Sequence, residues 1–152
     1  MDGNATEEKG HLTGTWAEFA LGRLDTAGYR RGGSRRQVID YLATRDCAVT
    51  APEIDERLEG VGRASVYRTL EQLEQLGLLQ RVDLGGDSAA FERVDPAGHH
   101  HHHLVCTRCG RVLPFEDEAL EAAIHELPAK EGFTIEGHEV TLRGPCRRCG
   151  PA

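Results

Sequence analysis

Residues 99–110 read HHHHHLVCTRCG, and this stretch decides how the second half of the chain is organised. Five consecutive histidines run into a short apolar segment and then into a Cys-x-x-Cys-Gly motif, which occurs again at residues 146–150. Two thiolates at this spacing bind one side of a tetrahedral ion, and four complete a closed structural zinc site. The sequence therefore predicts a structural four-cysteine zinc site formed by Cys106, Cys109, Cys146 and Cys149.

Redox dithiols, or four unrelated free thiols, are the alternative interpretation of these cysteines. Redox motifs do not usually occur as a matched pair, so the pattern favours zinc. A closed site has no open coordination position, and its zinc would stabilise the fold instead of catalysing a reaction. Cys47 has no partner motif, and we expect an ordinary buried thiol there.

The histidine run has the pattern of a strand that serves two separate metal sites. Alternate residues of an extended chain face opposite sides, so His101 and His103 face one way while His100 and His102 face the other. Glu121 lies on a predicted helix and His138 on a predicted strand, and both can complete a site. The alternative is a solvated polar strand. Imidazole suits zinc, iron, nickel and manganese, so the ligands alone do not select the metal.

Composition limits the classes of protein that this chain can be. Its 152 residues carry 18 Lys and Arg against 25 Asp and Glu, a net charge of −7, which excludes a protein that is basic throughout. Hydrophobic residues make up 39% and charged residues 28%, as in a globular protein. No segment approaches the roughly 20 apolar residues of a membrane helix. The polar, acidic N-terminus is unlike a signal peptide, so we expect a cytoplasmic protein.

The first two thirds of the chain have the element order of a winged helix-turn-helix. Apolar residues from Trp16 to Leu24 recur at helical spacing, and Ser34 is expected to cap a second helix. Thr50 and Glu53 form a capping box for a third helix. The fourth helix is predicted over residues 63–76, and a β-hairpin follows over residues 78–84 and 89–94.

A composition break at residues 95–98 separates this region from a second one. Beyond it we predict strands over residues 101–105 and 111–115, a helix from Asp117 to Leu127 that Pro128 stops, and a strand over 133–142. The expected domains are a mobile leader (1–15), a winged-helix DNA-binding domain (16–94), a hinge (95–98) and a metal-binding domain (99–152).

The predicted fourth helix carries side chains suited to DNA. Arginine can bond guanine, a tyrosine ring can pack on thymine methyls, and serine can bond phosphate. Five arginines against one acid between Arg23 and Arg36 give a local charge of +4 for backbone phosphates, although a solvated charged face is the alternative. The candidate DNA-contacting residues are Arg30, Arg35, Arg36, Arg63, Ser65, Tyr67 and Arg68.

Residues 63–70 (RASVYRTL), the histidine run and the two cysteine motifs occur in an order and spacing that resemble the ferric uptake regulator family. These proteins are metal-dependent bacterial transcription factors, and the resemblance covers about residues 18–150. It implies an N-terminal winged-helix DNA reader, whose segment around Arg30 approaches the minor groove, and an α/β C-terminal dimerisation domain. The expected fold class is therefore α+β, with metal binding that favours a DNA-competent dimer.

The resemblance also implies three ligand sets. The four cysteines match the family's structural zinc site. His102 stands where many members have aspartate, which gives a three-histidine, one-glutamate site suited to zinc. The set that links the strands of the dimerisation domain to its helix comprises His100, His102, Glu121 and His138, and the sensory set at the hinge comprises Glu92, His101 and His103.

The chain departs from the family pattern in the sensory set. The family usually has a histidine where this chain has Ala48, and an acidic residue where it has Pro114. Candidates for a fourth ligand are Glu116, Asp87 and Cys47. We expect zinc or iron as the sensed metal, with manganese or nickel as alternatives.

The sequence thus predicts a metal-responsive regulator that binds double-stranded operator DNA as a homodimer, most often as a repressor of metal-homeostasis genes. No membrane partner and no small-molecule substrate are expected. The alternative is a zinc-dependent hydrolytic enzyme that uses the histidine cluster to activate water. Against an enzyme, the sequence lacks a Ser-His-Asp order, a His-Glu-x-x-His motif and a glycine-rich phosphate loop. A metal buffer would not need residues 18–94.

Overall fold

The computed structural model describes residues 8–150, with side chains from Trp16 onward. The chain divides after Asp95 into two compact units. Residues 1–7 of the expected leader lie outside the described residues, and helix α1 (Glu8–Thr26) begins earlier than the helix expected from Trp16. Among the described residues, no helix is both long and apolar enough to cross a membrane.

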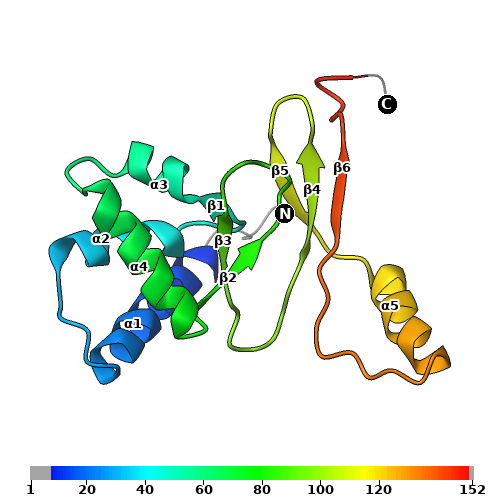
Figure 1. Cartoon of the computed structure of the whole chain (residues 1–152), viewed down its shortest axis with the longest axis horizontal. Helices are drawn as coiled ribbons and strands as arrows, with labels where there is room; N and C mark the ends of the chain where they lie inside the picture. Colours follow the sequence, from blue (N-terminus) through cyan, green and yellow to red (C-terminus); the bar gives the residue numbers. More distant parts are fainter. Residues whose placement is uncertain (1–7, 151–152) are drawn as a thin grey trace, which may run out of the picture. The chain divides into compact units, whose positions relative to one another are not determined.

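The first unit combines helices with a small antiparallel sheet of strand order β1-β3-β2 (Figure 1). Its elements after α1 are α2 (Gly33–Ala43), β1 (Val49–Thr50), α3 (Ala51–Arg57), α4 (Arg63–Gln75), β2 (Leu79–Val82) and β3 (Ala90–Arg93). The β2–β3 hairpin is the predicted wing. Strand β1 was not predicted, because two residues carry no period of their own, and it exists only through its pairing with β3.

Local sequence signals account for the start of α3 but not for that of α2. The capping box is confirmed, since Thr50 Oγ1 accepts from the Glu53 amide and Glu53 Oε2 accepts from the Thr50 amide at 2.6 Å. The cap expected from Ser34 is wrong. Helix α2 begins after Gly32, whose extended backbone (φ −149°) puts its carbonyl 3.1 Å from the Arg36 amide, so Ser34 lies inside the helix.

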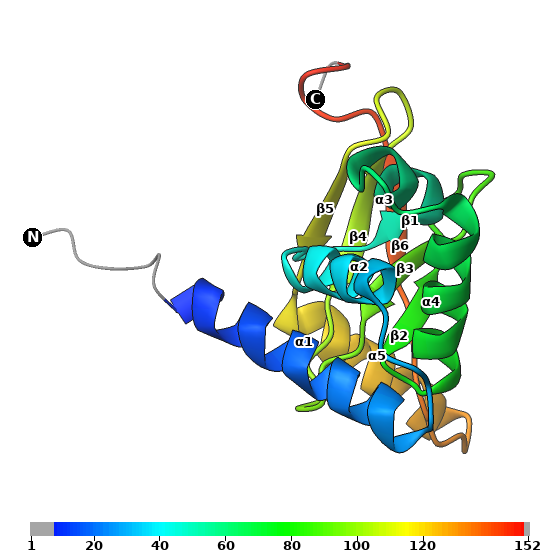
Figure 2. The ribbon, with the colours of Figure 1, turned by 90° about the vertical axis from the view of Figure 1, so that its left-hand side faces the viewer.

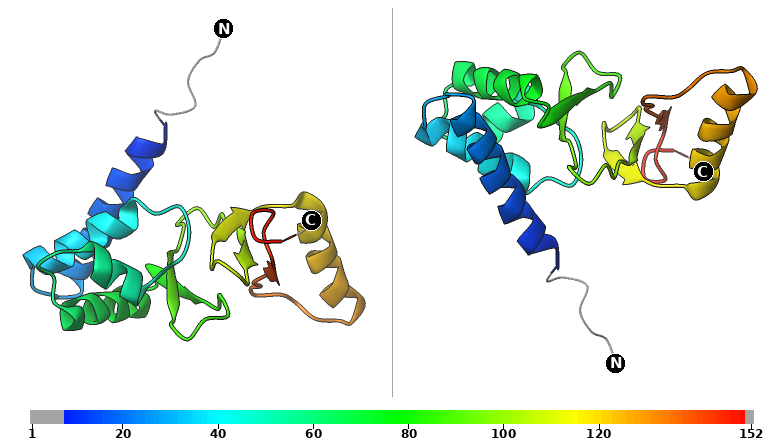
Figure 3. Two further views of the ribbon diagram at one scale, coloured as in Figure 1. Left: turned by 90° about the horizontal axis from the view of Figure 1, so that it is seen from above. Right: turned by 90° about the horizontal axis from the view of Figure 1, so that it is seen from below.

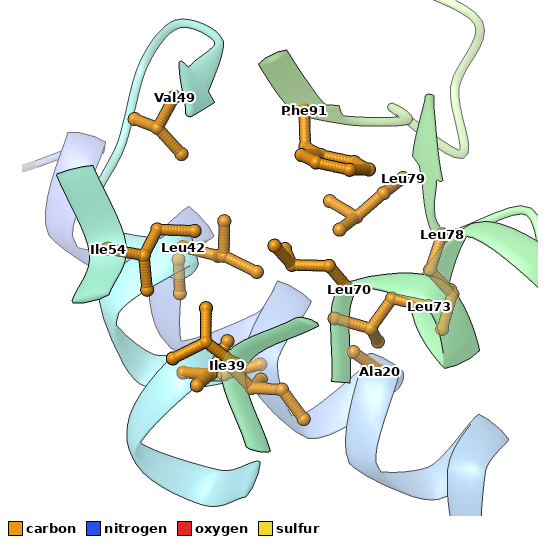
Figure 4. Packing of buried hydrophobic residues seen from close by; sticks show 14 of the residues in the cluster. Ala20, Ile39, Leu42, Val49, Ile54, Leu70, Leu73, Leu78, Leu79 and Phe91 are labelled. Carbon is orange, nitrogen blue, oxygen red and sulfur yellow. The ribbon is translucent and has the colours of Figure 1, made fainter. Parts of the chain in front are cut away.

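A single apolar core holds the first unit together. Helix α2 contacts both α1 and α4 (Figure 2). Ile39 from α2, Ile54 from α3 and Leu70 from α4 are fully buried and belong to one cluster with the hairpin residue Phe91 (Figure 4). Burial of side chains of this size contributes about 1.5–3 kcal/mol each, so the apolar side of α4 is fixed against the core. Its opposite side is left at the surface, where Tyr67 is 47% exposed.

The second unit is a three-stranded sheet of order β5-β4-β6 with one helix, α5, on the β6 side (Figures 1 and 3). Strand β4 pairs antiparallel with β5 and parallel with β6. The bounds are β4 (His102–Cys106), β5 (Val112–Phe115), α5 (Glu118–Lys130) and β6 (Thr141–Gly144).

Two sequence expectations about this unit are wrong. The strand predicted over residues 133–142 is only β6, because pairing with β4 begins at Thr141. Pro128 does not stop α5, which continues to Lys130. Pro128 has no N–H for the carbonyl of Ile124 and so costs the helix one backbone hydrogen bond, but only two residues of α5 follow it, so the loss does not interrupt the helix interior. The Pro128 carbonyl then accepts from the Phe133 amide at 2.7 Å, where the chain turns back.

One side of the second sheet carries a row of exposed leucines. Leu104 of β4 is the register partner of both Leu113 on β5 and Leu142 on β6. The three side chains, the leucine row, are 39–51% exposed, and every residue of α5 is also at least partly exposed. Singly exposed apolar residues are ordinary, but a contiguous row marks an interaction surface.

Candidate metal centres and nucleic-acid interface

The two cysteine motifs meet because of the strand pairing. Parallel strands have their carboxyl ends at the same edge of a sheet, and Cys106 at the end of β4 is the register partner of Gly144 at the end of β6. Each strand runs directly into its Cys-x-x-Cys motif. The four sulfurs, those of Cys106, Cys109, Cys146 and Cys149, all lie within 4.8 Å of one another.

The electrostatics of this cysteine cluster suit a divalent cation. Backbone amides, first that of Cys146 at 3.2 Å, lower the pKa of Cys106 to about 6, so it is readily a thiolate. The neighbouring sulfurs, first that of Cys109, hold the proton of Cys149 and raise its pKa to about 12. Four thiolates so close together would repel one another unless a cation compensated their negative charges. The donor set therefore fits tetrahedral zinc.

The glycine after each motif has a structural reason. Gly110 adopts φ +71° and donates its amide to the Cys106 carbonyl at 2.9 Å. A Cβ on Gly150 would lie 2.9 Å from the Cβ of Pro145, so no larger residue fits without movement. The guanidinium of Arg108 donates to the Cys149 carbonyl and ties one motif to the other. Sequence reasoning did not single out Arg108, because its partner lies 41 residues away.

A second group of possible ligands, which we call the inner cluster, consists of His100, His102, Glu121 and His138. Their ligand atoms lie within 4.8 Å of one another. Strand alternation predicted that His100 and His102 share a side, and the structure brings both to Glu121 of α5. Glu121 Oε1 lies 2.6 Å from His102 Nε2, 3.2 Å from His138 Nε2 and 3.3 Å from His100 Nε2.

The inner cluster also fits a metal ion. One carboxylate oxygen faces three imidazole nitrogens, and the Nε2 atoms of His100 and His138 are themselves only 3.0 Å apart. The contact with His102 lowers the pKa of Glu121 most. Burial raises this pKa and the contact with His138 lowers it again, so that it falls to about 2 and the carboxylate is charged at neutral pH. The ring of Phe115, which the sequence did not single out, lies 5.4 Å from the ring of His102. Three nitrogens and a carboxylate around one point are a donor set for zinc.

The residues of the predicted sensory set are distributed over both units. His101 and His103 follow the other side of β4, with ring centroids 5.1 Å apart. Glu92 lies on β3 of the first unit, where Gln80 Nε2 is 3.5 Å from its Oε2. Cys47 is half-buried just before β1, whose Val49 pairs with Phe91 beside Glu92. Within the first unit, the pairing of β1 with β3 thus brings the Cys47 segment toward Glu92.

The predicted DNA-contacting residues of α4 differ in their surroundings. Tyr67 and Arg68 are exposed, while Ser65 is half-buried and its carbonyl accepts from the Thr69 hydroxyl at 2.7 Å. Arg63 at the start of the helix pairs with Asp55 of α3 at 3.1 Å. Of the predicted contact residues on α4, Tyr67 and Arg68 are thus exposed, whereas Arg63 is engaged with α3.

The predicted DNA-contacting arginines of the loop before α2 and of the first turn of α2 are partly engaged with nearby groups. Arg36 forms an exposed ion pair with Asp40 at 3.0 Å. Arg35 donates to the carbonyl of Arg30, and its guanidinium stands 5.7 Å from the ring of Tyr29. Exposed pairs of this kind contribute about 0–1 kcal/mol, so a phosphate can replace the acidic partner at little cost.

Comparison with known proteins gives relatives over most of the chain. The profile of the ferric uptake regulator family matches residues 26–143. The ferric uptake regulation proteins of Shigella flexneri and Escherichia coli K12 are 35% and 34% identical over 128 residues, which is 81% of this chain and 85% of each relative. The solved ferric uptake regulator of Vibrio cholerae is 33% identical with a TM-score of 0.72, over 81% of this chain and 96% of that one.

Two further solved structures agree in fold. The regulator of Pseudomonas aeruginosa with manganese is 28% identical with a TM-score of 0.66, over 84% of this chain and 98% of that one. The Helicobacter pylori regulator has a TM-score of 0.78 at 21% identity, over 92% and 95% of the two chains. The predicted α+β fold class is thus confirmed, and the enzyme alternative finds no support. The chain belongs to the ferric uptake regulator family of metal-responsive transcriptional regulators.

Proposed function

We propose that this chain binds double-stranded operator DNA as a metal-loaded homodimer and represses metal-homeostasis genes. One observation carries the proposal: α4 buries Val66 and Leu70 in the core while Tyr67 and Arg68 on its other side are exposed. A helix fixed in this way presents its outer side chains to the major groove. Because the DNA that it binds is in the cytoplasm of a bacterium, we place the protein there.

Base reading is assigned to Tyr67 and Arg68. Arginine bonds guanine O6 and N7, and a tyrosine ring packs on thymine methyls. Phosphate contacts fall to Ser65 and to the arginines Arg30, Arg35, Arg36 and Arg63. The exposed ion pairs that Arg36 and Arg63 form are weak. In a dimer the two copies of α4 would enter successive major grooves about 34–36 Å apart.

The leucine row is assigned as the surface that contacts a second copy of this chain. Around a two-fold axis the same apolar row of each copy can cover that of the other. Leu104 is two residues from His102 on β4, so the leucine row and the inner cluster share one side of the sheet. A metal ion in the inner cluster would also hold α5 against the side of the sheet that carries the leucine row. It would thereby support dimerisation.

Zinc is proposed at both sites of the second unit, with the four cysteines as one ligand set and the inner cluster as the other. A bound divalent ion would compensate the close sulfur or carboxylate charges and cross-link the residues that hold it. The cysteine site joins the ends of β4 and β6, and the inner cluster joins β4 to α5. A unit of this size has a small core and gains much from such cross-links.

The sensed metal is assigned to Glu92, His101 and His103, with Cys47 as the fourth ligand. Among the three candidates for that position, Cys47 belongs to the segment that the pairing of β1 with β3 brings toward Glu92. A ligand shifts an equilibrium only by its differential affinity for the two states, so these residues must bind the metal more tightly in the DNA-competent dimer. Zinc, iron and manganese are the candidates, since related structures are described with manganese and with zinc.

The cysteine site is tested by Cys106→Ser. Loss of one of four ligands should lower zinc affinity by more than about a hundredfold, because changing a residue that only contacts a ligand already lowers metal affinity by up to about that factor. The second unit should then lose its thermal transition, as measured by zinc content and melting of the full chain. Cys47→Ser, outside the cluster, is the control and should keep this zinc. A stable Cys106→Ser dimer with unchanged zinc would contradict the assignment.

The DNA surface is tested by separating base contacts from phosphate contacts. Tyr67→Ala and Arg68→Ala should each cost about 1–3 kcal/mol on the specific operator and little on scrambled DNA. Arg36→Ala should weaken both alike and lower the slope of affinity against salt by about one. Fluorescence anisotropy at several salt concentrations measures both effects. If Arg68→Ala keeps the wild-type ratio of specific to scrambled binding, α4 does not read the bases.

The dimer surface is tested by Leu104→Glu. Each buried leucine contributes about 1.5–3 kcal/mol, and the two-fold axis applies the loss twice, so the dimer dissociation constant should rise at least about a hundredfold. Sedimentation equilibrium measures this constant. Tyr67→Ala, at an equally exposed position in the first unit, should leave it unchanged. A Leu104→Glu chain that remains fully dimeric would place the interface elsewhere.

The two sides of β4 are tested against each other with double variants. His101→Ala/His103→Ala should leave a folded, zinc-containing dimer that no longer gains operator affinity when metal is added. His100→Ala/His102→Ala should loosen the second unit, so that dimer mass falls first and DNA binding follows. Operator affinity is measured against free metal, with the mass determined in parallel. A full metal response in the first variant would show that the inner cluster is the sensor.

A further inference from the structure

His125 stands next to the inner cluster but is not part of its compact set of ligand atoms. It lies four residues after Glu121 on α5, so both side chains project from the same face of the helix. Its Nε2 is 3.9 Å from Glu121 Oε2, and its ring centroid is 6.0 Å from that of His138. The imidazole is therefore the neighbour of the second carboxylate oxygen, the one that the three inner histidines do not face.

The distance from His125 Nε2 to Glu121 Oε2 distinguishes a hydrogen-bond partner of the carboxylate from a metal ligand beside it. At 3.9 Å the nitrogen and the oxygen are too far apart for a hydrogen bond, whose usual limit is about 3.2 Å. Two zinc–ligand bonds of about 2.0–2.2 Å each can span the same distance, so one ion can touch both atoms. A carboxylate can bind one ion through both oxygens, which brings Glu121 Oε2 and its imidazole neighbour into the reach of the ion held by the inner cluster.

Exposure of the side chains indicates the path by which an ion reaches the cluster. Within the inner cluster the side chain of His102 is 2% exposed, that of His138 15% and that of His100 42%, and His125 beside the cluster is 68% exposed. His125 thus lies on the solvent side of Glu121, where an arriving ion meets it early and a departing ion leaves it late. An exposed imidazole is also free to change rotamer, so it can close on an ion without moving the helix.

We propose that His125 is a fifth protein ligand of the inner cluster and controls how fast the ion leaves. This inference rests on the proposed metal site at His100, His102, Glu121 and His138. Glu121 and His125 act together as a two-ligand grip from one helix, while the other three ligands come from the strand side. An additional bond at the exposed side must break before the ion can exchange with solvent, so the cluster retains its metal for longer.

The test uses the full chain with His101→Ala/His103→Ala as background, so that the sensory set does not bind metal. With zinc kept in the cysteine site, Co2+ is titrated into the background chain and into His125→Ala and His125→Gln. Both variants should bind Co2+ about tenfold more weakly and release it correspondingly faster to a chelator. Their visible Co2+ bands should intensify, because the ion loses one donor atom and Co2+ absorbs more strongly at lower coordination number. Glutamine keeps the size and polarity of histidine but is a poor ligand.

Glu126→Ala is the matched control, since it changes the next residue of α5, whose side chain pairs with Lys130 at 3.6 Å. It should leave Co2+ affinity, release and spectrum unchanged. If the His125 variants also leave all three unchanged, His125 is a bystander and the inference is wrong, while the inner cluster stands. If the background chain itself binds no Co2+ beyond the zinc site, or if Glu121→Ala binds it equally well, the inner cluster and the role of His125 both fall.

Discussion

The parallel pairing of β4 with β6 is the constraint on which the second unit depends. It joins segments that lie far apart in the sequence and puts their carboxyl ends at one edge, so two Cys-x-x-Cys motifs become one four-sulfur cluster. A parallel pair needs a long crossover, and that crossover carries α5 with Glu121 and the loop with His138. One pairing therefore creates both clusters, the first at the end of β4 and the second at its beginning.

Polar contacts supplement a thin apolar attachment of α5, in which Leu120 and Ile124 are only half-buried. All its residues are at least partly exposed, whereas a helix on a sheet normally buries an apolar stripe. Its described links to the strand side converge on Glu121, through His100, His102 and His138. Such an arrangement makes the position of the helix responsive to whatever occupies the cluster. The leucine row lies on the same side of β4, so the attachment of α5 and the proposed dimer surface are neighbours.

The first unit follows the opposite principle. Its helices and hairpin bury one apolar core, in which Ile39, Leu70 and Phe91 meet from different elements. The proposed DNA contacts lie on the other side of α4, where Tyr67 and Arg68 are exposed. Rigid apolar packing suits a unit that must hold one helix in a fixed orientation. Ligand clusters suit a unit that must respond to an ion.

The sequence by itself determined the features that local rules govern. The Thr50 capping box, the order of helices and hairpin, the two cysteine motifs and the two sides of the histidine run all follow from spacing within a few residues. Period two along an extended chain was enough to put His100 and His102 together, and the resemblance to the family supplied Glu121 and His138 as their partners.

Only the tertiary structure decided the features that depend on distant partners. The sequence could not limit the last strand to Thr141–Gly144, because its ends are set by β4, nor predict β1, which exists only against β3. It placed a cap at Ser34, where the extended Gly32 begins the helix, and a stop at Pro128, where the last turn tolerates a proline. The tie from Arg108 to the Cys149 carbonyl also emerged only in three dimensions, because the two residues lie 41 positions apart and are brought together by packing.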